Sequence, residues 1–204
     1  MLFHVVNLGC KVNKVESDSY AAQCLSAGLA EGTLEAADLI VVNTCAVTGE
    51  AEKKTRKTVR HVCNKNDHAK VLVTGCSAAL HADIYQGMSP RIVVLGKAFT
   101  AEYLSDLLRS DSRGKNSLQQ ENAQSVAAVP VLPVGEGFRT RVGIKVQDGC
   151  NNECTYCIVH VARGKATSRL TQEIIDEVRA YSALGAKELV LTGINLGSYH
   201  QTYQ

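Results

Sequence analysis

The sequence predicts an α/β protein that is built on a parallel sheet. Within the first hundred residues, short β-branched runs alternate with segments that are suited to helices, which is the pattern of α/β folds. The runs are almost continuously apolar, as expected of parallel strands that helices cover on both faces. Strands are therefore predicted over residues 3–8, 39–42, 70–73 and 91–95.

The connecting segments are predicted to be helices that pack on this sheet, in the manner of a Rossmann- or flavodoxin-like domain. One helix is expected over residues 15–29 and a second after Thr48, because apolar side chains recur at helical spacing in both. The residues expected to be buried are Tyr20, Ala21, Cys24, Leu25 and Gly28 in the first helix and Val59, Val62 and Cys63 in the second. A free cysteine in such a position acts as a small hydrophobe, so Cys24 and Cys63 are predicted core residues.

Composition limits the class of protein. With 204 residues and 45% hydrophobic content, the chain is large enough for one or two ordinary domains. No apolar run approaches the ~20 residues that a membrane span needs, and the first residues do not resemble a signal peptide, so a cytoplasmic protein without membrane contact is expected. A net charge of +2 neither requires nor excludes nucleic acid. Eight cysteines favour metal binding or free thiols over disulfides in such a protein.

A polar stretch divides the chain. Residues 110–138 are turn-prone and hold two of the three prolines, so they are predicted to link a first domain over 1–109 to a second over 139–204. A short extended piece over 131–134, packed on the sheet, is an alternative for part of this linker.

The second domain is predicted to start as a β-loop-α-β unit. Strands are expected over 142–146 and 188–192, and the helix between them is expected to be capped by Thr171 and ended by Gly185. Its apolar face consists of Ile174, Ile175, Val178, Tyr181 and Leu184. This unit would open a parallel (β/α) barrel, which takes ~250 residues when complete. The residues from 139 onward are far fewer, so we expect an amino-terminal fragment with the truncated start of a partial barrel.

Three cysteines form a CxxxCxxC motif directly after the first strand of this unit. Cys150, Cys154 and Cys157 can hold three irons of a [4Fe–4S] cube and leave the fourth iron open, because thiolates are the ligands such clusters take. A zinc site completed by His160 and buried core cysteines remain alternatives. A ferredoxin motif fits worst, because no fourth cysteine follows at ferredoxin spacing.

Three further cysteines occupy equivalent positions in the first domain. Cys10, Cys45 and Cys76 each come just after a predicted strand, and the carboxyl ends of parallel strands share one edge of a sheet. We therefore expect these cysteines to meet in space as a second site with three thiolates. Gly9 and Gly75 are expected to let the backbone pass close to a bulky cluster.

The second-domain motif resembles that of a known family. Residues 146–157, Val-Gln-Asp-Gly-Cys-Asn-Asn-Glu-Cys-Thr-Tyr-Cys, are followed by Ala-Arg-Gly at 162–164 and Ser-Arg at 168–169, and together they resemble the signature of radical S-adenosylmethionine methylthiotransferases. The resemblance implies that a cluster on Cys150, Cys154 and Cys157 binds S-adenosylmethionine, which one electron cleaves to a 5′-deoxyadenosyl radical. Tyr156 would then lie near the adenine.

The first domain resembles the amino-terminal domain of the same family. The matching stretches are Leu-Gly-Cys-Lys-Val-Asn at 8–13 with Glu16, Val-Asn-Thr-Cys-Ala-Val-Thr at 42–48, and Val-Thr-Gly-Cys at 73–76. The resemblance implies that Cys10, Cys45 and Cys76 hold an auxiliary [4Fe–4S] cluster, which is implicated in supplying or carrying the inserted sulfur.

Members of this family modify adenosine 37 of tRNA or an aspartate of a ribosomal protein. The motifs around Cys10, Cys150 and residues 192–199 look most like the branch that converts N6-threonylcarbamoyladenosine to its 2-methylthio form, with a tRNA substrate and a flavodoxin- or ferredoxin-type electron donor. Isopentenyladenosine or the ribosomal-protein aspartate is an alternative substrate, and a non-catalytic iron–sulfur or zinc module is an alternative of another class. We expect the 204-residue chain alone to be inactive.

Overall fold

The computed structural model describes residues 1–112, 132–134 and 140–200. Its amino-terminal part is a parallel sheet in the strand order β2-β1-β3-β4-β5. The strands are β1 (Leu2–Asn7), β2 (Ala30–Glu31), β3 (Leu39–Thr44), β4 (Lys70–Gly75) and β5 (Ile92–Val94). This order confirms the expected α/β fold, and it is the order found in flavodoxin-like domains.

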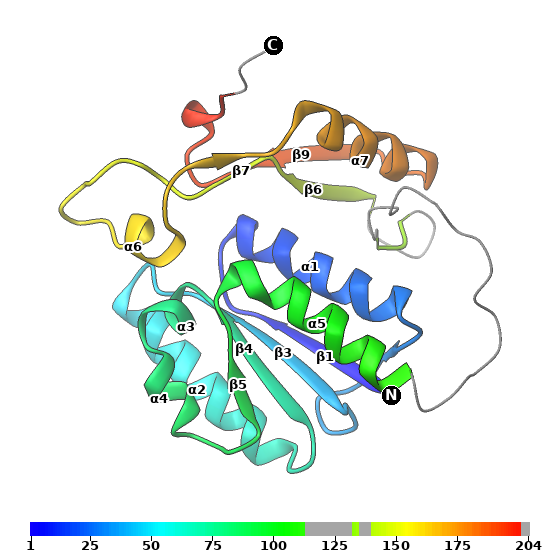
Figure 1. The fold of residues 1–204 in the computed structure, drawn as a ribbon, viewed down its shortest axis with the longest axis vertical. Helices are drawn as coiled ribbons and strands as arrows, with labels where there is room; N and C mark the ends of the chain where they lie inside the picture. The colour runs from blue at the N-terminus through cyan, green and yellow to red at the C-terminus, as the bar shows by residue number, and fades with distance from the viewer. Residues whose placement is uncertain (113–131, 135–139, 201–204) are drawn as a thin grey trace.

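Helices cover both faces of the sheet (Figure 1). One face carries α1 (Lys11–Ser26) and α5 (Lys97–Ser112), and the other carries α2 (Gly49–Lys65), α3 (Cys76–Leu80) and α4 (Ala82–Gln86). Successive residues of β3 point to opposite faces, so Leu39 and Val41 pack toward α1 and α5, whereas Ile40 and Val42 pack toward α2 and α4. Every residue of β3 is buried. Full burial on both faces explains why the strand sequences are continuously apolar.

The second part of the chain is a smaller unit that lies against α1. Its parallel strands β6 (Arg141–Lys145) and β9 (Glu188–Thr192) are connected through α7 (Thr171–Ala183), which confirms the predicted β-loop-α-β unit. Ile144, Val146 and Tyr181 form its core. Two strands that the sequence did not reveal, β7 (Gln147–Asp148) and β8 (Thr167–Ser168), pair in antiparallel fashion and close a loop over residues 149–166. This loop contains α6 (Val159–Arg163), and a short 3-10 turn (Leu196–Ser198) follows β9.

The first helix begins and ends earlier than predicted. It starts at Lys11, directly after Cys10, and Gly28 lies beyond its end with φ of +83°. Gly28 is exposed and not part of the buried stripe. A glycine in this left-handed conformation commonly follows the last turn of a helix. The prediction for Cys24 is confirmed, since its side chain is fully buried and burial raises the pKa of its thiol to about 11.

The second helix follows its prediction. Thr48 caps α2 by accepting a hydrogen bond from the Ala51 backbone N–H at 3.1 Å. Val59 and Val62 are buried, and Cys63 is half-buried against the same core.

Two expectations for α7 were wrong. Thr171 is the first helical residue and not the cap, because its hydroxyl pairs with the Tyr199 hydroxyl at 3.2 Å and Leu170 occupies the cap position. Ile175 and Leu184 are exposed. In the described part of the chain, α7 packs on a sheet of only two strands, so it buries a narrower apolar face than the sequence suggested. Gly185 does end the helix, with φ of +93°.

Most of the predicted linker over 110–138 lies outside the described residues. Helix α5 continues to Ser112, three residues past the predicted domain boundary. Residues 132–134 form no strand, although Val134 packs against the core of the second unit. The exact domain boundaries stay a prediction. No helix of the described chain combines the length and apolar character needed to cross a membrane.

Asn66, which ends α2, ties several backbone segments together although only 2% of its surface is exposed. Its Nδ2 lies 2.9–3.2 Å from three carbonyl oxygens, and its Oδ1 accepts two backbone N–H groups at 2.7 and 3.1 Å. The carbonyls belong to Leu34, Glu35 and Ala37, and the N–H groups to His68 and Ala69.

We predict that Asn66→Ala lowers the free energy of unfolding of the amino-terminal part by about 2–3 kcal/mol, because it leaves buried backbone groups without partners. Asn64→Ala, at an exposed position of the same helix, should change it by no more than about 0.5 kcal/mol. Urea unfolding followed by circular dichroism measures both. Equal effects of the two substitutions would contradict this role of Asn66.

Candidate metal centres and the network between them

The structure places Cys10, Cys45 and Cys76 at one edge of the sheet. Cys10 lies between β1 and α1, Cys45 directly follows β3, and Cys76 begins α3 directly after β4. All three are at the carboxyl ends of neighbouring strands, as the sequence predicted. The strand order reverses between β1 and β3, and open α/β sheets bind ligands at such a point. Cys10 is exposed, whereas Cys45 and Cys76 are buried.

Two glycines shape the backbone at this edge. The backbone of Gly75 has φ of +100°, and a Cβ there would lie 2.4 Å from the Thr44 carbonyl oxygen. A Cβ at Gly9 would lie 2.4 Å from Cγ of Asn13. These glycines therefore allow close approach of protein atoms, and their close approach to a cluster stays a prediction.

The loop over 149–166 carries Cys150, Cys154 and Cys157, all half-buried. Gly149 turns the chain with φ of +68°, and the Cys150 N–H then donates to the Gly164 carbonyl at 3.1 Å. The Sγ of Cys150 lies 3.4 Å from the Asn152 N–H and 3.8 Å from the Asn195 amide. These two donors fix the position of the sulfur, and they can remain its partners when it binds a metal.

Tyr156 lies in this loop with 90% of its surface exposed. A hydrogen bond with Cys154 is the main cause that raises the pKa of its hydroxyl, and the charges of Cys154 and Cys157 add to it. The ring is thus beside two of the three cysteines and open to a ligand. A contact with adenine stays a prediction.

The donor chemistry of both sets fits iron–sulfur clusters, since each set offers three soft thiols. Within the described residues, no group of three Cys, His, Asp or Glu side chains already converges closely enough to hold a metal ion. Cluster binding would therefore require the thiols of each set to turn toward a common point. His160, the candidate fourth zinc ligand, has a buried Nδ1 for which the described chain offers no hydrogen-bond partner.

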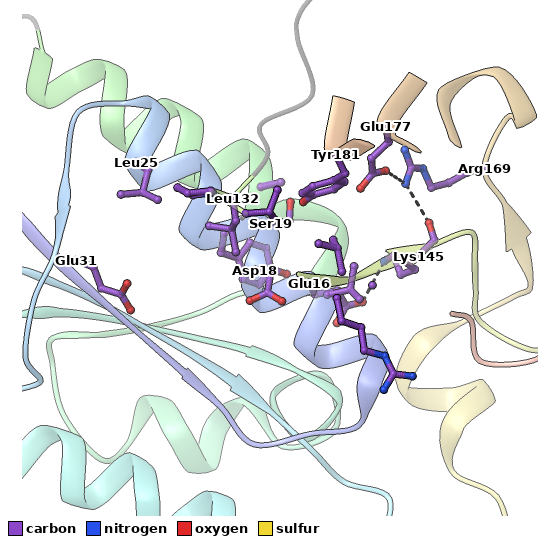
Figure 2. Close-up of a pocket in the computed structure, with 18 of the residues that line it drawn as sticks. Glu16, Asp18, Ser19, Leu25, Glu31, Leu132, Lys145, Arg169, Glu177 and Tyr181 are labelled. Carbon is purple, nitrogen blue, oxygen red and sulfur yellow. Dashed lines mark hydrogen bonds and ion pairs between the residues drawn. The ribbon is translucent and has the colours of Figure 1, made fainter. Parts of the chain in front are cut away.

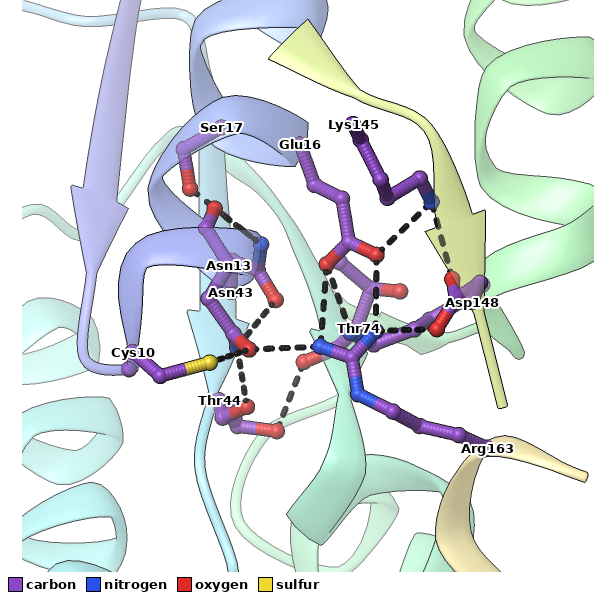
Figure 3. A network of polar contacts seen from close by, with 12 residues as sticks. Cys10, Asn13, Glu16, Ser17, Asn43, Thr44, Thr74, Lys145, Asp148 and Arg163 are labelled. Atoms are coloured by element: carbon purple, nitrogen blue, oxygen red, sulfur yellow. Dashed lines mark hydrogen bonds and ion pairs between the residues drawn. The ribbon is translucent and has the colours of Figure 1, made fainter. Parts of the chain in front are cut away.

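A buried arginine connects the two sets (Figure 3). Arg163, at the end of α6, has a side chain that is only 1% exposed. Its Nη1 donates to Asp148 at 2.6 Å and to Glu16 at 3.1 Å, and its Nη2 donates to Asn13 at 2.7 Å. Asp148 precedes Cys150 by two residues, and Asn13 follows Cys10 by three. The guanidinium therefore bridges the segments that carry the two cysteine sets.

Asn13 continues this network into the edge of the sheet. Its Oδ1 accepts from the Cys10 thiol at 3.4 Å, and its Nδ2 donates to Asn43 Oδ1 at 3.0 Å and to the Thr44 carbonyl at 2.9 Å. Thr44 in turn donates its hydroxyl to the Thr74 carbonyl at 2.6 Å. Side-chain hydrogen bonds thus join residues that lie within three positions of Cys10, Cys45 and Cys76.

Glu16 is the negative centre of the network, with 6% of its side chain exposed. Burial alone would raise the pKa of its carboxyl, but Lys97, Lys145 and Arg163 together hold it below the usual value of 4.5. These cations come from three different elements, α5, β6 and α6. The same carboxylate therefore binds the second unit to the first. Burial alone would lower the pKa of Arg163, but the nearby Glu16, Cys76 and Asp148 raise it, so the guanidinium stays charged.

A cavity of about 660 Å³ lies between α1 and the second unit (Figure 2). Its lining is mainly apolar and includes Tyr181 and Leu132. Glu16 and Lys145 also line it and belong to the polar network. None of the six candidate cysteines is among its described lining residues. The candidate chemistry is thus at the sheet edge and not in this cavity.

Sequence reasoning placed the cysteines but gave no role to Arg163, Glu16 or Asn13. Their signal was weak, because polar residues near the ends of helices usually face solvent. The spacing offered one clue, since Asn13 and Glu16 follow Cys10 at intervals of three and share one helical face.

Comparison with known proteins identifies two domains. The family described as uncharacterized protein family UPF0004 matches residues 2–96, and the radical SAM superfamily matches residues 144–201. The two matches divide the chain as the structure does.

Curated relatives match almost the whole chain. A threonylcarbamoyladenosine tRNA methylthiotransferase of Thermotoga maritima is 38% identical over 96% of this chain and 44% of its own length. A tRNA-2-methylthio-N(6)-dimethylallyladenosine synthase of Cutibacterium acnes is 33% identical, over 97% of this chain and 41% of its own. A ribosomal protein uS12 methylthiotransferase of Clostridium tetani is 30% identical, over 97% and 45%. The chain spans less than half the length of these relatives.

We predict that stability falls when the pH drops below about 5. The lowered pKa of Glu16 means that the folded state keeps this carboxyl ionised while the unfolded chain takes up a proton near 4.5, so its contribution is present above that pH and is lost below it. Glu16→Gln should lower stability at pH 7 by about 3–5 kcal/mol and flatten the acid side of the profile. Urea unfolding between pH 7 and pH 3.5 measures both effects.

Glu50→Gln is the matched control, because the Glu50 side chain is 85% exposed. Its pH profile should follow that of the unaltered chain. If the free energy of unfolding of Glu16→Gln still falls below pH 5 as steeply as that of the unaltered chain, another group causes the loss of stability.

Proposed function

The chain belongs to the radical S-adenosylmethionine methylthiotransferases, and we propose that the protein containing it adds a methylthio group to C2 of N6-threonylcarbamoyladenosine 37 in tRNA. The enzyme family follows from the two matched domains and from relatives that are all methylthiotransferases. The choice of substrate is supported by the printed function of the Thermotoga maritima relative, which has the highest identity of the three compared. Because the chain spans about 44% of that relative, the activity of the whole protein is part of the proposal.

One structural observation supports sulfur insertion in particular. Cys76, from the first cysteine set, packs against Ala162 of α6, and α6 begins two residues after Cys157 of the second set. The two candidate centres therefore face one region between the two units. A reaction that needs a radical source and a sulfur donor together requires such an arrangement.

We propose roles for the residues as follows. Cys150, Cys154 and Cys157 hold a [4Fe–4S] cluster that supplies reductive cleavage of S-adenosylmethionine, and Tyr156, exposed beside them, contacts its adenine. Cys10, Cys45 and Cys76 hold the auxiliary cluster. Asn195 and the Asn152 N–H orient Cys150 through their contacts with its sulfur. A flavodoxin- or ferredoxin-type protein is the proposed electron donor, and tRNA is the proposed macromolecular substrate.

The substrate is tested by comparing three acceptors under the same conditions. The full-length protein, loaded with iron and sulfide, is given S-adenosylmethionine and a reductant with tRNA bearing threonylcarbamoyladenosine, with tRNA bearing isopentenyladenosine, or with ribosomal protein uS12. We expect methylthio product only from the first, detected by mass spectrometry. Product from either of the other two alone would assign the protein to the branch of the corresponding relative.

We predict about eight irons per chain after anaerobic reconstitution, because each cysteine set would hold one four-iron cube. Replacement of Cys150, Cys154 and Cys157 together by alanine should leave about four, and replacement of Cys24 and Cys63 should leave the iron content unchanged. Iron analysis and the absorbance near 400 nm measure this. Loss of all iron in the triple variant would argue against a separate second cluster, and zinc in place of iron would support the binding-module alternative.

We also predict that the two cysteine sets have separable roles. Cys45→Ala in the full-length protein should abolish methylthio insertion but leave most of the cleavage of S-adenosylmethionine, because the radical source is on the other unit. Cys154→Ala should abolish both, since a cluster that loses a thiolate no longer presents an open iron. Quantification of 5′-deoxyadenosine and of modified tRNA separates the two steps. Loss of cleavage in a folded Cys45→Ala variant would refute this division.

A further inference from the structure

We propose that Arg163 is a positioning residue that fixes the loop bearing Cys150, Cys154 and Cys157 against the cysteine edge of the amino-terminal sheet. The inference rests on the proposed function, because it explains how two centres that must cooperate are kept in register. Three features of the surroundings of Arg163 support this role.

The first feature is the fixed geometry of the side chain. The Arg163 side chain is 1% exposed and both terminal nitrogens of its guanidinium are engaged, with Nη2 also 3.5 Å from the second oxygen of Glu16. A planar guanidinium that meets a carboxylate through two nitrogens has a defined orientation as well as a charge. A lysine side chain could supply the positive charge but not the two coplanar nitrogens that fix the orientation.

The second feature is that both ends of this bridge lead directly to cysteines. On the sheet side, Asn13 accepts from Arg163 and from the Cys10 thiol with the same oxygen. On the loop side, Asp148 accepts from Arg163 with Oδ1, and that oxygen also accepts from the Gly149 N–H at 2.8 Å. Gly149 directly precedes Cys150. Each path from the guanidinium to a candidate ligand thus passes through one side chain.

The third feature is that the backbone beside Arg163 holds the loop as well. The carbonyl of Gly164 accepts from the Cys150 N–H at 3.1 Å, and Ala162 packs against Cys76. A Cβ at Gly149 would lie 2.0 Å from the Lys165 carbonyl oxygen, so the two ends of the loop are in close contact. A displacement of Arg163 would therefore move Cys150 with it.

A simpler explanation is that Arg163 only neutralises the buried Glu16. Lys97 provides the comparison, because it contacts the same carboxylate from α5 and lies within the amino-terminal part. Lys97→Met removes one positive charge from the network but cuts no link between the two cysteine sets. Arg163→Met removes one positive charge and cuts the link. A role in positioning predicts different results for the two variants, and a role in neutralisation predicts similar ones.

The first measurement uses the iron-loaded, full-length protein and the ratio of S-adenosylmethionine cleaved to methylthio groups inserted. In Arg163→Met we expect both clusters and most of the cleavage to remain, while insertion falls about 100-fold, because a misplacement of ~1 Å can cost this much in rate. Arg163→Lys should give an intermediate ratio, and Lys97→Met should leave the ratio unchanged. An unaltered ratio in Arg163→Met, or an equal rise in Lys97→Met, would overturn the proposal.

The second measurement needs neither clusters nor activity. Small-angle X-ray scattering of the metal-free 204-residue chain should show a larger radius of gyration for Arg163→Met than for the unaltered chain and for Lys97→Met, because the second unit loses its fixed contact with the sheet edge. An unchanged radius in Arg163→Met would overturn the docking role. If the unaltered protein modifies none of the three acceptors, the proposed function fails, and the scattering result still decides the role of Arg163.

Discussion

A single buried carboxylate determines how the two halves of this protein meet. Glu16 is removed from water, so it stays ionised only because cations surround it. Those cations are distributed over α5, β6 and α6, and the charge balance is complete only when both units are docked. The relative position of the two units is therefore set by the need to bring Lys145 and Arg163 to Glu16, in addition to apolar contact. An arrangement of the second unit that left this carboxylate without Lys145 and Arg163 would bury an uncompensated charge.

The sheet and the positions of the cysteines could be predicted from the sequence because both follow from local patterns. Continuously apolar strands indicate parallel pairing, and parallel pairing brings residues 10, 45 and 76 to one edge whatever the details of the helices. The two-residue strands β2, β7 and β8 were missed, since two residues form no recognisable hydrophobic period. The roles predicted for Gly28 and Thr171 were wrong because the sequence indicates a helix boundary only to within a few residues. It does not show which residue adopts the backbone conformation of that boundary.

The polar network escaped prediction for a different reason. Asn13, Glu16 and Arg163 are residue types that normally remain in water, and their burial depends on partners up to 150 positions away in the chain. No local pattern encodes such partners. The resemblance to a family included these residues in its motifs, yet a motif does not state what a side chain touches. The structure supplies the missing information by placing all three around one point.

The difference in burial among the three sheet-edge cysteines affects how reagents reach them. Cys10 is exposed directly before α1, whereas Cys45 and Cys76 are buried, with 7% and 4% of their surfaces accessible. In the metal-free chain, an oxidant or an alkylating reagent therefore meets Cys10 long before the other two. Chemical modification of this edge would therefore begin at a single thiol, before the two buried cysteines react.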